Sequence, residues 1–488
     1  MIQRQAAIGR SRGDGDSKWL WVLVVVVVGL IAVGIWAGAF TTPAWSDRDL
    51  GELETRVKAA ELVLANRPGN RPPIGVPRSG NAFDYYDRVA STIDRIATEN
   101  SSAIKTLYCQ IAVKEATRLT LHDLLNGLSG TEVEAILADE GELSLSSLLV
   151  GALSIVLPTA QDSPGWDSEQ WKKFLPVKQW VADTFRPVTD LVEAGAACVV
   201  AKRDTSRDMP ALLLGLETAC RPELPGPVFW EIVQSAVTAA VMQEEPERVL
   251  RLLATTLQYG RDCLDDPAPR VSQYGSWTIS WMSGANLTWP DLDYGTTPTN
   301  PLHRRLAAMM GRLDEKKARI FEKYLTGLAR SLPSPGYWIK YGLTYFGRAV
   351  LDHRFQSPLP RSRLLRLMMT ELMRRSSRYG TGALSRSVDS FRDVERDTDS
   401  QFDTKDTLFA VFWRESIGLE PFRLETLLDL RITLNSFLLA SRRDRPIADP
   451  YGDVLHTEER QGMTFIWSNG DDGKNDGGDS VKDRVMFR

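Results

Sequence analysis

The stretch Trp19–Phe40, WLWVLVVVVVGLIAVGIWAGAF, is an apolar run without a charged residue. At about 1.5 Å per residue, a helix over this run would be about 33 Å long, which is enough to cross a hydrocarbon core of about 30 Å. Trp19, Trp21 and Trp36 lie near its ends, where interfacial aromatic residues are common. We therefore predict a single N-terminal transmembrane helix over residues 19–40.

The two flanks of this run differ in charge. The segment 1–18 is rich in basic residues, which are Arg4, Arg10, Arg12 and Lys18. The segment that follows residue 40 is rich in acidic residues, which are Asp47, Asp49, Glu52 and Glu54. Arg and Lys are retained on the cytoplasmic side of membrane helices. We expect a single-pass protein of the inner (cytoplasmic) membrane, with residues 1–18 in the cytoplasm and the bulk of the chain outside it.

Two further interpretations of the run stay open. Ala37-Gly38-Ala39 fits the cleavage site of a secretory signal peptide, with cleavage after Ala39, although the apolar run is longer than the roughly 7–15 residues of a signal-peptide core. Gly34 and Gly38 form a G-x-x-x-G pair, which would allow two anchors to pack as a homodimer. We expect an uncleaved anchor.

Composition limits the partners and the chemistry. A net charge of −4 gives no electrostatic reason to bind nucleic acid, and we expect none. The four histidines are scattered without a zinc-ligand spacing. The four cysteines permit three disulfide pairings, but their apolar helical contexts favour buried free thiols; they are Cys109, Cys198, Cys220 and Cys263.

Helical periodicity dominates the rest of the chain. Residues 41–80 read as a juxtamembrane helix followed by a Pro- and Gly-rich linker, residues 81–264 as a helical domain, and residues 301–441 as its continuation. Helices are predicted at about 50–66, 82–98, 102–125, 144–157, 168–186, 188–202, 209–218, 227–243, 246–262, 301–312, 314–331, 336–354, 361–378, 384–397, 406–417 and 421–441. The fold class is mainly α, an all-α bundle or irregular solenoid with a small β-containing C-terminal tail.

Residues 265–300 interrupt this pattern with an excursion rich in Pro, Gly and aromatic residues. Trp277, Ile279 and Trp281 alternate as on one face of a short strand. The aromatic residues of the excursion would form a platform for a glycan or peptide, or would pack onto the helical body, and the second interpretation is favoured. They are Tyr274, Trp277, Trp281, Trp289 and Tyr294. The arginine-rich helix 361–378 would face anionic headgroups or an acidic partner, or simply solvent, and solvent is favoured.

A search for catalytic motifs is negative. The sequence contains no G-x-S-x-G, H-E-x-x-H or Walker loop, and no G-x-G-x-x-G after a strand. We assign no catalytic residue and no organic cofactor, and a non-enzymatic protein is favoured.

The tail, residues 442–488, has a different character. Two strand-like pieces, Met463–Trp467 and Arg484–Phe487, flank a loop rich in Asp, Asn and Gly. Oxygen ligands on a Gly-rich backbone suit Ca²⁺, which accepts flexible geometry. A metal-free surface turn is the alternative.

This tail resembles the C-terminal β region of the major pseudopilins of type II secretion systems, which carry D-P-W-G, an apolar strand, S-x-G-x-D-G and a calcium loop. The matching residues here are Asp449-Pro450-Tyr451-Gly452 and Ser468-Asn469-Gly470-Asp471-Asp472-Gly473. The resemblance implies that Asp472 and Asp479 are side-chain calcium ligands, with the carbonyl of Asn469 and the carboxylate of Asp483 as further candidates. The anchor lacks the prepilin cleavage signal, so we interpret the tail as a module carried by a different envelope protein.

We therefore expect a membrane-anchored, extracytoplasmic helical scaffold or adaptor of the bacterial cell envelope, related to secretion through its pseudopilin-like calcium-binding tail, with an envelope protein as its partner. The alternative is an envelope enzyme or glycan-binding protein that uses the aromatic excursion 265–301.

Overall fold

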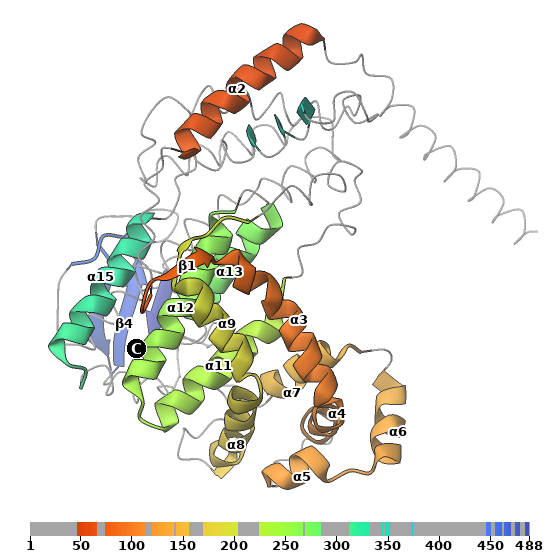
Figure 1. Ribbon diagram of the computed structural model, residues 1–488. Helices are drawn as coiled ribbons and strands as arrows, with labels where there is room; N and C mark the ends of the chain where they lie inside the picture. The colour runs from red at the N-terminus through yellow and green to blue at the C-terminus, as the bar shows by residue number, and fades with distance from the viewer. Residues whose placement is uncertain are drawn as a thin grey trace, which may run out of the picture.

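The computed structural model describes part of the chain, and helices dominate that part (Figure 1). The described residues are 46–65, 74–113, 120–140, 143–155, 169–203, 224–266, 269–284, 312–331, 343–344, 347–348, 350–351, 373, 446–449, 454–460, 463–469, 474–478 and 484–487.

The centre of the helical body is α12 (Pro246–Leu264), which packs against α9 (Arg186–Ala196), α11 (Gly226–Met242), α13 (Pro269–Gly284) and α15 (Glu315–Ser331) (Figure 1). From Leu252 to Leu264 every residue of α12 is buried. Because this includes polar side chains such as Gln258 and Asp262, the core contains a hydrogen-bonded polar network as well as apolar contacts.

Two glycines allow α12 and α13 to approach closely. A Cβ atom added at Gly275 would lie 2.3 Å from the backbone nitrogen of Leu264 and 2.4 Å from the backbone oxygen of Gly260. Only a residue without a side chain fits this position, so the crossing depends on glycine.

Among the described residues from 74 to 184, seven helical segments precede α9. They are α3 (Phe83–Glu99), α4 (Ser101–Tyr108), the π-helical turn η1 (Cys109–Val113), α5 (Leu121–Asn126), α6 (Gly130–Glu140), α7 (Leu145–Ile155) and α8 (Glu169–Thr184). The predicted helices 82–98, 144–157 and 168–186 are confirmed by α3, α7 and α8. The single helix predicted over 102–125 is wrong in extent, because α4 passes into η1 and the next helix, α5, begins after a capping box at Thr120.

A two-stranded parallel sheet was not predicted. β1 (Arg78–Asn81) pairs with β2 (Cys198–Val200), so the predicted linker 67–80 ends in a strand and the helix predicted over 188–202 stops at Ala196. The side chain of Asn81 extends the pairing, since its Oδ1 accepts from the backbone N–H of Lys202 at 2.9 Å.

The strand interpretation of Trp277, Ile279 and Trp281 is wrong, because these residues lie on α13. Tyr274 and Trp281 both stack on Trp230 of α11, with ring centroids 5.7 and 6.0 Å apart. The described part of the predicted excursion 265–300 is thus largely a core helix. Tyr274 and Trp281 pack onto the helical body as favoured, whereas Trp277 is exposed, and residues 285–300 lie outside the described residues.

Helix α2 (Asp47–Ala65) confirms the helix predicted at about 50–66. It lies beside the described residues between 343 and 351 (Figure 1), and Nε and Nη2 of Arg348 each donate to the carboxylate of Glu61 at 2.6 Å. Leu53, Val57 and Ala60 form its buried face.

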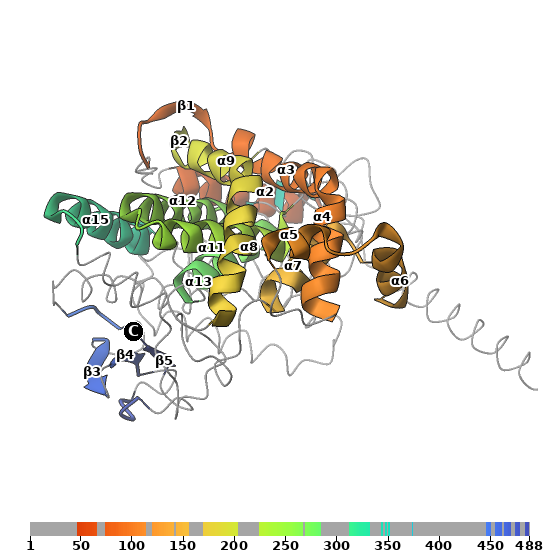
Figure 2. The ribbon, with the colours of Figure 1, turned by 90° about the horizontal axis from the view of Figure 1, so that it is seen from below.

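The C-terminal module, which comprises the described residues between 446 and 487, stands to one side of the helices (Figure 2). It contains an antiparallel sheet in the order β3 (His456–Arg460), β4 (Met463–Ser468) and β5 (Arg484–Phe487). Both predicted strand-like pieces are confirmed, and β3 is an addition.

Several expectations fall outside the described residues. These include the anchor 19–40 with Gly34 and Gly38, the arginine-rich helix 361–378 apart from Met373, and the predicted helices 209–218, 384–397, 406–417 and 421–441. Within the residues that the structure describes, none of the helices is long and apolar enough to span a bilayer. Cys109, Cys198 and Cys263 are buried free thiols, in agreement with the favoured interpretation.

Candidate functional site

The C-terminal module is built around β4, whose two neighbours pair with it along most of its length. His456 pairs with Trp467 on one side, and Ser468 pairs with Arg484 on the other. Residues 469–483, here called the acidic loop, therefore begin and end at adjacent positions of the sheet. Ile466 and Trp467, which directly precede this loop, are buried, and Ile466 belongs to the main hydrophobic core.

Asp449 holds the entrance of the acidic loop. Its Oδ1 accepts from the hydroxyl of Ser468 at 2.7 Å, and its Oδ2 accepts from the backbone N–H of Asn469 at 2.9 Å. Asp449 is only 4% exposed, and a buried carboxylate with two donors is strongly held. These bonds join the D-P-Y-G sequence, which begins at Asp449, to the second part of the motif, which begins at Ser468, about twenty residues later in the chain.

A second set of hydrogen bonds orients the middle of the acidic loop. Oδ1 of Asn475 accepts from Nε1–H of Trp467 at 3.0 Å and from the backbone N–H of Gly477 at 2.9 Å. Its Nδ2 must then donate to Nδ1 of His456, 3.5 Å away. This assigns the ring proton of His456 to Nε2, which donates to Oδ1 of Asn469 at 2.8 Å.

Of the predicted calcium ligands, the structure describes Asn469 alone. Its side-chain oxygen accepts a hydrogen bond from His456. The resemblance implies its backbone carbonyl, and not its side chain, as a calcium ligand. Asp472, Asp479 and Asp483 lie outside the described residues. Among the residues described, no three His, Cys, Asp or Glu side chains gather as a metal site.

Sequence reasoning did not single out the roles of His456 and Asn475. The available signal was local: Asn475-Asp476-Gly477 is a typical turn sequence, and Gly477 and Gly478 adopt φ values of 75° and 79°. The pairing with His456 depends on the β3–β4 register, which a single strand pattern does not reveal.

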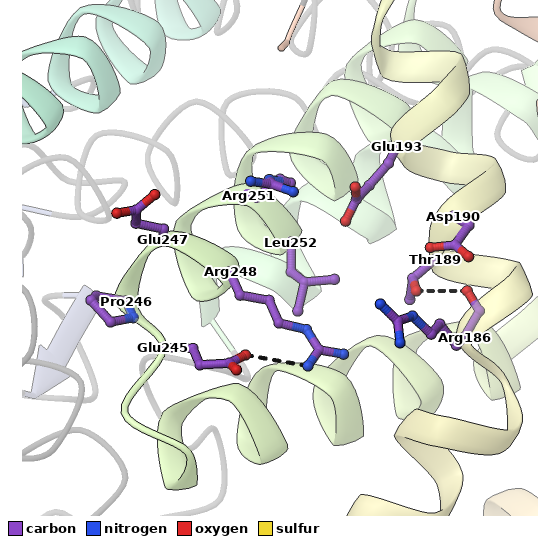
Figure 3. Close-up of a pocket in the computed structure, with 10 residues that line it drawn as sticks. All are labelled: Arg186, Thr189, Asp190, Glu193, Glu245, Pro246, Glu247, Arg248, Arg251 and Leu252. Carbon is purple, nitrogen blue, oxygen red and sulfur yellow. Dashed lines mark hydrogen bonds and ion pairs between the residues drawn. The ribbon is translucent and has the colours of Figure 1, made fainter.

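A separate charged pocket of about 480 Å³ lies between α9 and the start of α12 (Figure 3). It is lined by Arg186, Thr189, Asp190, Glu193, Glu245, Pro246, Glu247, Arg248, Arg251 and Leu252. The α9 residues follow the i, i+3, i+4, i+7 spacing and so share one face of that helix. In Figure 3, Arg186 extends from α9 and Arg248 extends from α12 toward the same space.

Several charged groups of the pocket are paired with other described residues. Arg248 donates to Glu245 at 3.3 Å, and Lys317 of α15 donates to Glu247. Between described residues, no ion pair within 4 Å involves Arg186, Asp190, Glu193 or Arg251. Burial raises the pKa of Glu193 above its ordinary value, although Arg251, Arg248 and Arg186 act in the opposite direction.

No protein-family model, curated protein or solved structure matches this chain. Its function is therefore inferred from the residues and their geometry.

Proposed function

We propose that this protein is a membrane-anchored, non-enzymatic helical scaffold or adaptor of the bacterial envelope whose C-terminal module binds Ca²⁺ through the acidic loop. The observation that carries the calcium assignment is the pair of hydrogen bonds that the carboxylate of Asp449 accepts. It ties the D-P-Y-G turn sequence to Ser468 and Asn469 at the start of the acidic loop, where the resemblance to pseudopilin tails calls for a calcium ligand.

The composition of the acidic loop supports a hard cation. It contains five aspartates and two lysines, and it contains four glycines. The aspartates are Asp471, Asp472, Asp476, Asp479 and Asp483. Carboxylates confined to a short closed loop repel one another, and a bound Ca²⁺ would offset that repulsion while accepting carboxylate and carbonyl oxygens.

The helical body supports the scaffold part of the proposal. Tyr274 and Trp281, which the alternative function needed on an exposed platform, are packed against Trp230. Trp277 is the member of this set that reaches solvent, at 42% exposure. A single exposed indole is ordinary for a protein surface.

Calorimetric titration of the full chain with Ca²⁺ tests the proposal. We expect saturable binding in the native protein, weaker binding of Mg²⁺ because of its stricter octahedral geometry, and loss of Ca²⁺ binding in the double variant Asp472→Ala/Asp479→Ala. The matched control is Asp84→Ala/Asp94→Ala on α3, which removes the same charge and should bind normally.

Trp467 supplies an independent readout. Its indole N–H is bonded to Asn475 in the acidic loop, so Ca²⁺ binding should change its fluorescence. The calcium-dependent change should disappear in Trp467→Phe. Absence of calcium binding at millimolar concentrations in the native chain would refute the proposal.

A further inference from the structure

The parallel ribbon formed by β1 and β2 lies on the helical body, apart from the C-terminal module (Figure 2). Within the described residues this sheet has two strands, and β1 lies at the outer edge of the body. Arg78 and Ala82 donate their backbone N–H groups inward, to Ala197 at 2.9 Å and to Val200 at 2.8 Å. Because these groups alternate from side to side along a strand, the backbone N–H and C=O of Ser79 point away from β2.

Three valines expose apolar surface on this ribbon. Val76, just before β1, is 83% exposed, and Val199 and Val200 of β2 are 49% and 50% exposed. Successive residues of a strand face opposite sides of the sheet, so neither face of the ribbon is fully covered. A two-stranded sheet is only marginally stable by itself, and an open edge is a template for a further strand.

The ribbon also carries a cation at each end. Arg78 begins β1 and Lys202 follows β2; both are exposed, and neither forms an ion pair with another described residue. The side chain of Asn81 holds the backbone of Lys202 through two hydrogen bonds, of 2.9 and 2.5 Å. The exposed acid Asp84 follows β1 but lies in the first turn of α3, where the helix N-terminus offsets its charge.

We propose that β1 accepts a third strand, supplied by an extended peptide segment of a partner protein in which apolar and acidic residues alternate. Its backbone pairs with Ser79 along the open edge, and its carboxylates lie near Arg78 and Lys202. Ser79 and Gly80 are small, so its apolar side chains have room to cover β1. A second copy of this chain fits the edge less well, because it brings another basic strand to a basic edge. The location of the partner in the envelope rests on the function proposed above.

Fluorescence anisotropy of the full chain with three labelled peptides tests the proposal. The probe is the acetylated and amidated hexapeptide E-V-T-V-E-V. The second peptide has lysine in place of glutamate, and the third carries N-methyl groups on alternate backbone nitrogens, which removes strand hydrogen bonds. Each change should lower the affinity at least about tenfold, the loss expected when a hydrogen-bonding or charged partner is removed. A calcium chelator should leave probe binding unchanged, which separates this result from the test of calcium binding.

Variants of the chain locate the site. Ser79→Pro removes an outward N–H from the edge of β1, and Arg78→Glu reverses a charge; each should weaken probe binding at least about tenfold. Arg88→Glu, an exposed charge reversal on α3, is the matched control and should bind normally. Circular dichroism confirms that the variants are folded.

Three outcomes would each overturn the proposal: no probe binding at millimolar concentrations, equal affinity for the N-methylated peptide, or native affinity in folded Ser79→Pro. Self-association of the native chain that Ser79→Pro abolishes would also overturn it, and would assign the edge of β1 to a second copy of this chain.

Discussion

At the scale of single residues, the structure depends on buried polar groups that have partners. Arg203 and Asp266 are a clear case: Nε and Nη2 of the arginine donate to the two carboxylate oxygens at 2.9 and 3.2 Å, and both side chains are almost fully buried. Tyr86, Gln258 and Asp262 form a similar set, in which the carboxylate accepts from the tyrosine hydroxyl at 2.9 Å and from the amide at 2.8 Å. Arg203 thus connects the segment after β2 to the residues that follow α12, and Tyr86 connects α3 to α12.

Asp266→Ala should lower the free energy of unfolding by about 3–5 kcal/mol, because it removes the buried carboxylate that offsets the charge of the buried Arg203 guanidinium. The double variant Arg203→Met/Asp266→Leu should recover most of this loss, since it removes both charges together. The exposed pair Arg95–Glu99 is the control, and Glu99→Ala should cost less than about 1 kcal/mol. Urea unfolding measures all three, and equal losses at the buried and exposed pairs would contradict this account.

At the scale of elements, the position of helix α12 depends on glycines, which have no side chain, at its contact with α13. Gly260 and Gly275 remove two side chains at the crossing of α12 and α13, and Gly195 of α9 leaves room for the ring of Tyr86 on α3. The packing of α9 against α12 forms the charged pocket, because it places one face of α9 beside the first turns of α12. Element packing, rather than any local motif, brings Arg186 and Arg251 to one space.

Gly275→Ala should destabilise the helical body, although alanine is normally about 1 kcal/mol better than glycine inside a helix. Its Cβ would meet backbone atoms of Leu264 and Gly260, so α12 and α13 must separate. Gly327→Ala on α15 is the matched control, because no atom lies within 4 Å of the new Cβ, and it should be neutral or stabilising. Thermal denaturation of both variants distinguishes them; a stabilised Gly275→Ala would show that the crossing is loose.

At the scale of the whole molecule, we propose an N-terminal membrane anchor, a helical body and a C-terminal module. Ile447, Leu455 and Ile466 of the module belong to the same hydrophobic core as the helices. The charge difference on the two sides of residues 19–40 predicts that the C-terminus is outside the cytoplasm. A reporter that is active only in the cytoplasm, fused after Arg488, should therefore be silent, whereas the same reporter fused before Met1 should be active. Activity of the C-terminal fusion would reverse the proposed orientation.

Local patterns in the sequence predicted most of the described helices. α8, α11, α12 and α15 begin and end within a few residues of the predicted limits, because apolar periodicity and Pro or Gly at the ends are properties of the segment itself. The two tail strands were predicted for the same reason. On α13 the pattern was ambiguous: Trp277 and Trp281 suit both an alternating strand and the i, i+4 spacing of a helix, and packing against Trp230 favours the helix.

Only the tertiary structure decided the features that join distant parts of the chain. β1 pairs with β2 across about 120 residues, Asp449 reaches Ser468 and Asn469, and the charged pocket combines α9 with α12. A single sequence specifies the period of each element, but the partner of an exposed arginine or of a short strand depends on which elements pack together. The sequence therefore determined where most described helices lie and indicated the segment that we propose binds calcium, and the packing decided which charges share a pocket.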